Sequence, residues 1–240
     1  MIFHLLKPAR HWATIAVRLS TGVILTSDQA ATNEMEDERI RHGGEEPDEE
    51  EEEEEEGMPH RHVADRLLDS RVIQVAQPIT SELAEDVVGR LLLLDAEDEK
   101  APIDIYMDSP GGSVDAGFAI YDMARFISAP VRCICTGLTA SAAVLVLLAA
   151  PKKHRLSLPN ARFLIHQPSG GVRGSVADVK IEADEIIKIR KRINALIAGE
   201  TGQPVEKVDE DTSRNRWLSA EQAVEYGLIN KIVKSKKELK

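Results

Sequence analysis

Residues 131–150 read VRCICTGLTASAAVLVLLAA and combine a predicted strand with a predicted helix. Its first five residues are mostly apolar and predict a buried strand. The apolar run after Ser141 has the length of a core helix and is too short to cross a membrane. Ser141 therefore stands where a strand gives way to a helix. It is either a small capping or packing residue, or a nucleophile beside the free N–H groups of a helix N-terminus.

Strands and helices alternate on both sides of this stretch. The pattern predicts strands at residues 71–77, 103–108, 131–135, 154–158, 161–167 and 228–233. It predicts helices at residues 81–95, 114–126, 141–150 and 175–198, with shorter helices that start near Pro204 and Ser219. This alternation indicates a layered α/β domain.

The core is expected to be aliphatic, because only 4% of the residues are aromatic. In the first predicted helix the apolar residues recur at helical spacing. We expect this set to face the core: Leu83, Val87, Val88, Leu91 and Leu92.

The net charge of −11 comes from one segment. Residues 34–56 carry fifteen acidic and two basic side chains, whereas residues 57–240 are balanced. A balanced domain gives no reason to expect a nucleic-acid partner. The acidic segment repels itself and has no apolar face, so we expect residues 1–57 to be a disordered extension and residues 58–240 to be the folded domain.

The first 27 residues hold three basic side chains and no acidic one. This composition weakly resembles a transit peptide, but a disordered tail or an upstream start codon that is not the true one is the better explanation. A secretory signal fits worse, because Arg18 interrupts the only apolar stretch.

Cys133 and Cys135 lie two positions apart in a predicted strand, so their side chains point to the same face. Neighbours on one strand make a poor disulfide, and we expect both to be reduced core residues of a cytoplasmic protein. No cluster of Cys and His has the spacing of metal ligands, and we expect neither a metal nor another cofactor.

Three loops at predicted strand ends carry residues suited to chemistry. The loop DSPGGSVDAG places Gly111 and Gly112 before a helix. The free N–H groups there suit an oxyanion site. Alternatively, the two glycines simply allow a tight turn between the strand and the helix. The loop TGLTASAA contains Ser141, followed by the N–H of Ala142. The third, FLIHQPSGG, contains His166. Serine, histidine and paired backbone donors are the parts of acyl-transfer chemistry, although sequence spacing does not show that they meet.

About 165 residues, from Leu67 to Val233, closely resemble the Clp protease (ClpP) family of proteolytic subunits. The stretches that carry the resemblance are SPGGSVDAGFAIYD, the loop around Ser141, LPNARFLIHQPSGG, TGQPVEKVDEDTSR and LSAEQAVEYGLI. It implies a crotonase-like α/β fold, a spiral of repeated ββα units with a protruding handle helix from Ser175.

The resemblance also implies residue roles. Ser141 matches the family's nucleophile and His166 its general base. Gly112 and Ala142 match its oxyanion donors. A strand around Gly170 and Gly171 matches the segment that pairs with an unfolded peptide.

The family assembles two heptameric rings into a tetradecamer, and a Clp-type AAA+ ATPase feeds it unfolded proteins. We therefore expect self-association, alone or mixed with a ClpP paralogue, and no membrane partner.

Three positions depart from the family pattern. Asn215 stands where the family has the aspartate of its triad, and Asp209 and Asp211 are the nearby carboxylates that could replace it. Ser213 stands where the family often has an acid that pairs with the arginine matching Arg214. Asp104 replaces an aromatic residue of the ATPase docking pocket, where a buried charge is costly, although Tyr106 and Phe126 remain.

Three functions follow in order of support. The first is a serine endopeptidase subunit, whose activity in isolation is open because of Asn215. The second is a weakly active or non-catalytic ring partner of a paralogue. The third is a crotonase-like acyl-CoA enzyme, which would not need Ser141 beside His166, and which the IHQP and SPGG stretches do not favour.

Overall fold

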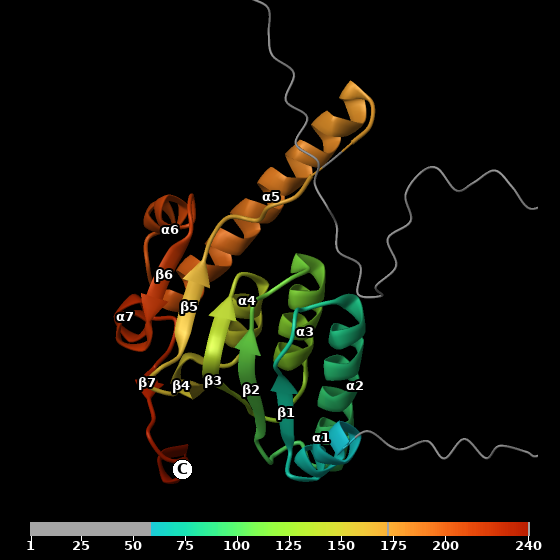
Figure 1. The fold of residues 1–240 in the computed structure, drawn as a ribbon, viewed down its shortest axis with the longest axis vertical. Helices are drawn as coiled ribbons and strands as arrows, with labels where there is room; N and C mark the ends of the chain where they lie inside the picture. Colours follow the sequence, from blue (N-terminus) through green and yellow to red (C-terminus); the bar gives the residue numbers. More distant parts are fainter. Residues whose placement is uncertain (1–58, 172, 240) are drawn as a thin grey trace, which may run out of the picture. The chain divides into compact units, whose positions relative to one another are not determined.

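A computed structural model describes residues 59–171 and 173–239 (Figure 1). The extension expected at residues 1–57 lies outside the described residues, so its expected disorder stays a prediction. None of the described helices is long and apolar enough to cross a membrane.

One seven-stranded sheet organises the described part of the chain. Its parallel strands are, in spatial order, β1 (Val72–Val75), β2 (Ile103–Ser109), β3 (Val131–Ala140), β4 (Arg155–Ser157) and β7 (Lys231–Ile232). β5 (Arg162–Ile165) pairs in parallel with the last residues of β3, and β6 (Arg216–Ser219) pairs with β5 in antiparallel. One helix connects each of the first neighbouring pairs, as parallel strands require.

The helices are α1 (Pro59–Asp69), α2 (Ser81–Glu97), α3 (Val114–Phe126), α4 (Ala142–Ala149), α5 (Val176–Thr201), α6 (Val205–Asp211) and α7 (Ala220–Tyr226), with short 3₁₀ helices η1 (Lys152–His154) and η2 (Lys236–Leu239). α2, α3 and α4 pack along one face of the sheet (Figure 1). The layered α/β fold predicted from the sequence is confirmed.

The buried face of α2 differs by one residue position from the prediction. Leu91 and Leu94 are fully buried, whereas Leu92 is 45% exposed and Val88 is only partly buried. The placement of Leu92 in the core was therefore wrong. Each helical residue is rotated by about 100° from the last, so positions 83, 87, 91 and 94 share one face and position 92 does not.

α5 is the protruding handle predicted from the sequence (Figure 1). Ser175 caps it through a capping box with Asp178, and Gly202 ends it in the left-handed conformation. Its buried residues all lie in the second half, from Ile193 to Thr201. The first half exposes Val176, Ile181 and Ile187, which is apolar surface that the other described residues leave uncovered.

Candidate active site

Ser141 lies at the junction between β3 and α4, in an unusual backbone conformation. Its φ is 56° and its ψ is −124°, outside the regions that residues with a side chain prefer. Its N–H donates to the carbonyl of Leu164 in β5 at 2.9 Å. Such strained residues persist where the surrounding structure holds them, and they cluster at functional sites.

His166 reaches Ser141 because their strands are neighbours. Ala140 of β3 is in register with Leu164 of β5, so the residues that follow both strands leave the sheet at the same edge. Nε2 of His166 lies 2.8 Å from Oγ of Ser141. The parallel pairing thus brings together two residues that are 25 positions apart in the sequence.

Asn215 lies beside His166 and comes from the chain next to β6, which pairs with β5 on the side away from β3. It directly precedes β6, whose Arg216 is opposite Ile165. Oδ1 of Asn215 lies 3.2 Å from Nδ1 of His166. Gln167 fixes this loop, because its N–H donates to the carbonyl of Thr212 at 2.6 Å and its side chain donates to that of Ser213 at 3.0 Å.

These contacts fit the tautomer of His166 that carries its proton on Nδ1. When Nδ1–H of His166 donates to Oδ1 of Asn215, Nε2 keeps its lone pair and accepts the hydroxyl hydrogen of Ser141. This is the tautomer that a general base needs. An amide can therefore hold the histidine in the productive orientation without adding a negative charge.

The glycine loop lies directly against the serine. Gly111 has φ 85°, and a Cβ added there would lie 2.7 Å from Cβ of Ser141 and 2.8 Å from N of Ala142. Gly112 follows and forms a bridge with Ile79. Ala142 opens α4, so its N–H has no partner within the helix. Gly111 and the Ala142 N–H thus lie beside Ser141, whereas the role of the Gly112 N–H as an oxyanion donor stays a prediction.

Neither nearby carboxylate replaces the missing aspartate. Asp211 accepts from Arg216 at 2.5 Å, from Lys207 at 2.6 Å and from Tyr226 at 2.9 Å. Asp209 accepts from the side-chain amide of Asn194. Both carboxylates bind partners other than His166, so the side chain beside Nδ1 of His166 is that of Asn215.

The strand expected around Gly170 and Gly171 is absent from the described chain. Residues 166–171 have no regular secondary structure, and both glycines are exposed. The expected pairing of this segment with a peptide stays a prediction. Pro168 lacks an N–H and glycine disfavours extended pairing, so this segment gains a strand only if another backbone supplies the partner.

A shallow apolar hollow of about 20 Å³ adjoins the serine–histidine pair. Its apolar walls are Val114, Ala142, Val144, Leu145, Ile165, Pro168, Ile193 and Ile197. It lies beside Ser141, and it is small and uncharged. Among the described residues there is no cluster of acidic, Cys and His side chains that could hold a metal ion.

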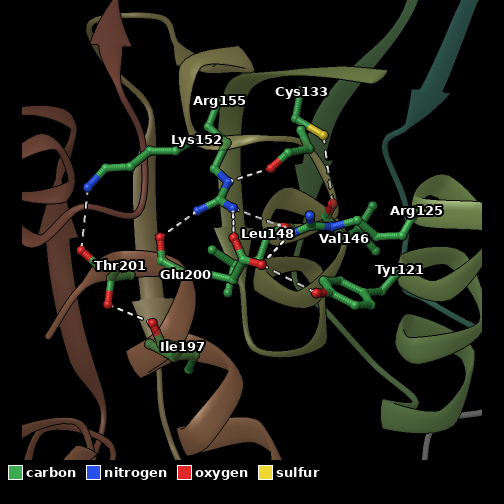
Figure 2. Close-up of polar contacts among 11 residues, drawn as sticks. Tyr121, Arg125, Cys133, Val146, Leu148, Lys152, Arg155, Ile197, Glu200 and Thr201 are labelled. Carbon is green, nitrogen blue, oxygen red and sulfur yellow. Dashed lines mark hydrogen bonds and ion pairs between the residues drawn. The ribbon is translucent and has the colours of Figure 1, made fainter. Parts of the chain in front are cut away.

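A partly buried ion cluster holds the far end of the serine's helix (Figure 2). Arg155 is fully buried and donates to the carbonyls of Ala150 at 2.7 Å and Leu148 at 3.2 Å. Arg125 donates to the same Leu148 carbonyl at 3.3 Å, and the Glu200 carboxylate accepts from both arginines. α4 is thus anchored at its C-terminus by two cations that suit its dipole.

Sequence reasoning missed this cluster. The one signal was Arg155, a charged residue at the start of an otherwise apolar strand. Its partner Glu200 lies 45 positions further on and has no local pattern to reveal it.

Comparison with known proteins agrees with this picture. The Clp protease family matches residues 54–236. The chain is 51% identical over 174 residues to the ATP-dependent Clp protease proteolytic subunit 2 of Treponema denticola, which covers 72% of this chain and 87% of that protein. It is 50% identical over 184 residues to subunit 2 of Gluconobacter oxydans, which covers 76% and 82%. An asparagine-to-aspartate mutant of ClpP1 from Listeria monocytogenes superposes with a TM-score of 0.69 at 44% identity, covering 74% of this chain and 99% of that one.

The fold and the match to the Clp protease family together define a serine-type peptidase. This chain belongs to the Clp protease family, and its function is that of a ClpP-type proteolytic subunit.

Proposed function

We propose that Ser141 is the nucleophile and His166 the general base of an endopeptidase that cleaves unfolded polypeptides. The 2.8 Å contact between Oγ of Ser141 and Nε2 of His166 carries the proposal. Asn215 acts as the residue that orients the histidine. Gly112 and Ala142 supply the backbone N–H groups that stabilise the oxyanion.

The chemistry follows from the geometry. Oγ of Ser141 attacks the scissile carbonyl carbon while its proton passes to Nε2 of His166. The tetrahedral oxyanion collapses, the C–N bond breaks, and the imidazolium returns the proton to the leaving amine. Water then hydrolyses the acyl-enzyme by the same route. The apolar hollow beside Ser141 favours a small or medium apolar side chain on the acyl side of the cleaved bond.

The exposed backbone at Gly170 and Gly171, which belongs to no strand of the described residues, is the proposed binding segment for substrate. An extended peptide would supply the partner strand that the isolated chain lacks, and its main chain would be recognised whatever its sequence. Such recognition suits unfolded polypeptides.

We further propose that this subunit works in heptameric rings that stack into a tetradecamer in the cytoplasm, alone or with a ClpP paralogue. The exposed apolar half of α5 supports an assembly through the handle. A Clp-type AAA+ ATPase is the proposed source of unfolded substrate, in line with the ATP-dependent relatives named above.

Labelling with a serine-reactive fluorophosphonate tests the residue roles. The full chain should be labelled at Ser141, and Ser141→Ala should abolish labelling. His166→Ala should slow it by about a hundredfold or more, because the general base is lost. Ser213→Ala, in the loop beside the site, is the matched control and should be labelled normally.

The same labelling experiment distinguishes an independent peptidase from a weakly active ring partner. Labelling of Ser141 without measurable peptide turnover, in a sample shown to be assembled, would favour that function over an independent peptidase. Equal labelling of the native chain and Ser141→Ala would overturn the nucleophile assignment itself.

A further inference from the structure

β2 and β3 lie side by side in the sheet, but their pairing shifts near the end of β2 (Figure 1). Met107 is opposite Cys135, whereas Ser109, two residues later, is opposite Thr139. β2 thus advances by two residues (107 to 109) while β3 advances by four (135 to 139). β3 therefore carries two extra residues, which makes a β-bulge. We call residues 136–138 the β3 bulge.

The β3 bulge decides which residue of β3 reaches the glycine loop of Gly111 and Gly112. Before the bulge, paired residues differ by 28 in number (107 and 135), and after it they differ by 30 (109 and 139). The first offset would place Gly111 level with Thr139 and leave Ser141 about 7 Å further along. The second places Gly111 level with Ser141, and a Cβ added to Gly111 would indeed lie 2.7 Å from Cβ of Ser141. The two extra residues therefore bring Ser141 to the glycine loop.

The contact between Ser141 and His166 depends on the other edge of β3. Residues 133–135 of β3 pair with β4, and residues 138–140 pair with β5 on the same side. The N–H of Ser141 donates to the carbonyl of Leu164 in β5 at 2.9 Å. β5 thus fixes Ser141 relative to His166, whereas the pairing with β2 fixes it relative to the glycine loop.

The side chain of Asp108 replaces backbone pairing that the β3 bulge interrupts. Its Oδ1 accepts from the N–H of Leu138 at 2.7 Å. At the other end of the bulge, Oγ1 of Thr136 donates to the carbonyl of Met107 at 3.0 Å. A hydrogen bond to a carboxylate is stronger than one to a neutral acceptor. Asp108 therefore holds the end of the bulge that is nearer to Ser141.

Gly137 leaves the space that this carboxylate occupies. A Cβ added to Gly137 would collide with Oδ1 of Asp108 and would lie 2.7 Å from its Cγ. An alanine at this position would therefore push the carboxylate away from the N–H of Leu138. Asp108 and Gly137 act as a matched pair, in which one supplies the acceptor and the other supplies the room for it.

Ser109 ties the glycine loop to the end of β2. It is fully buried, and its Oγ donates to the carbonyl of Gln77 at 2.6 Å. The same oxygen accepts from the N–H of Gly111 at 3.2 Å. Because the loop is attached in this way, a shift of β2 against β3 at Asp108 would move the glycine loop relative to Ser141.

We propose that Asp108 is a positioning residue for the peptidase reaction: its carboxylate closes the β3 bulge and holds the glycine loop in register with Ser141. The inference rests on the proposed function, because this register matters only if Ser141 is the nucleophile and the loop stabilises the oxyanion. Asp108 acts through the backbone of Leu138. Loss of its carboxylate should weaken oxyanion stabilisation and leave the contact between Ser141 and His166 intact.

Fluorophosphonate labelling of the full chain tests this role, because the phosphoryl oxygen of the reagent takes the place of the oxyanion. Asp108→Ala should lower the maximal labelling rate by about tenfold or more, without changing the reagent concentration that gives half of this rate. Asp108→Asn keeps an acceptor oxygen at the same place and should be labelled within about twofold of the native rate. The pH midpoint of labelling should stay native in both variants, because β5 still holds His166.

A matched control and a double variant separate this role from a general loss of structure. Asp122→Ala removes another exposed aspartate, on α3, and should be labelled at the native rate. Gly137→Ala should slow labelling as much as Asp108→Ala does, because the added methyl group displaces the carboxylate. The double variant should be no slower than either single variant, because the methyl group then enters the space that Asp108 leaves. Effects that multiply would overturn the inference.

The outcomes also distinguish this inference from the proposed function. A native chain that is not labelled at Ser141 would overturn the proposed function and this inference with it. Normal labelling of the native chain together with a native rate in Asp108→Ala, a slow Asp108→Asn or a shifted pH midpoint would overturn the role of Asp108 alone. Circular dichroism checks that each variant is folded. If Asp108→Ala does not fold, Gly137→Ala carries the test, and a native labelling rate in that variant would overturn the inference.

Discussion

Oδ1 of Asn215 lies 3.2 Å from Nδ1 of His166, so the residue that orients the proposed general base is a neutral amide. It accepts the Nδ1 hydrogen as a carboxylate would, but it cannot balance the positive charge that the imidazole gains during the reaction. Compared with a carboxylate, Asn215 keeps the orientation of His166 but stabilises its positively charged form less.

Asn215→Asp should therefore raise peptide turnover. A carboxylate would stabilise the imidazolium, and we expect a gain in kcat of one to several powers of ten, at about 1.4 kcal/mol of barrier for each. Steady-state cleavage of short fluorogenic peptides measures it, with assembly checked in the same sample. Ser141→Ala should abolish activity in both backgrounds. No change on Asn215→Asp in an intact ring, with Ser141 still essential, would mean that another group already orients His166.

The sequence predicted the central layers well and the periphery poorly. The ranges 114–126 and 103–108 match α3 and β2 closely, because their apolar periodicity is strong and their turns are clear. α1 and β6 were missed. β6 buries only Leu218, so its four residues show no alternation that a pattern could detect.

For the candidate site, too, local sequence patterns revealed the loops but not the contacts between them. The loops of Gly112, Ser141 and His166 stand out in the sequence because glycine pairs and polar residues interrupt apolar runs. Their meeting depends on the pairing of β3 with β5 and of β5 with β6, which no local signal specifies. Family resemblance supplied that part. It could not show that Asp209 and Asp211 are held elsewhere.

The two cysteines should be inert in the folded chain. Burial raises the pKa of the Cys133 thiol strongly and that of Cys135 to about 12, from an ordinary value of 9.0. At pH 8, Ellman's reagent should detect no thiol in the native protein and both in guanidinium chloride. Rapid reaction of either thiol in the native state would show that β3 is less buried than described.

The same thiols should make stability depend on alkaline pH. Above pH 9 the unfolded chain loses thiol protons that the folded chain retains, so the free energy of unfolding falls as pH rises. The slope approaches about 1.4 kcal/mol per pH unit for each thiol. Urea titrations between about pH 8 and 10.5 measure it, and the slope should be shallower in Cys135→Ala. An unchanged slope in Cys135→Ala would mean that groups other than this thiol cause the fall in the free energy of unfolding.

The exposed apolar residues of α5 should carry assembly. Ile187 is 51% exposed, and Ile187→Glu would place a charge in any interface that covers it. Sedimentation velocity at micromolar concentration should show the native chain, alone or with a paralogue, as an assembly of seven or fourteen subunits and the variant as smaller species. Lys188→Glu, next along the exposed face, is the control and should assemble normally. A native chain that stays monomeric in both conditions would count against the handle's role.

Glu200 joins the base of the handle to the far end of the serine's helix, and its charge should matter for both stability and reactivity. Its carboxylate accepts from Arg155, which is fully buried, and from Arg125, which is partly exposed. Glu200→Gln keeps the shape but leaves the buried Arg155 without its counter-charge. Breaking such a pair should cost about 3 kcal/mol of unfolding free energy, discounted from the fully buried case because Glu200 itself is 23% exposed.

Calorimetry should show this as a lower melting temperature, by roughly 6–12 °C for a domain of this size. The fluorophosphonate should also label Ser141 more slowly, by about tenfold at a temperature where the variant is fully folded, because α4 sets the position of both Ser141 and the Ala142 N–H. Glu185→Gln is the matched control: it makes the same change on the same helix, at an exposed pair with Lys188, and should alter neither quantity. A lower melting temperature with an unchanged labelling rate would show that the cluster stabilises the fold without positioning the serine.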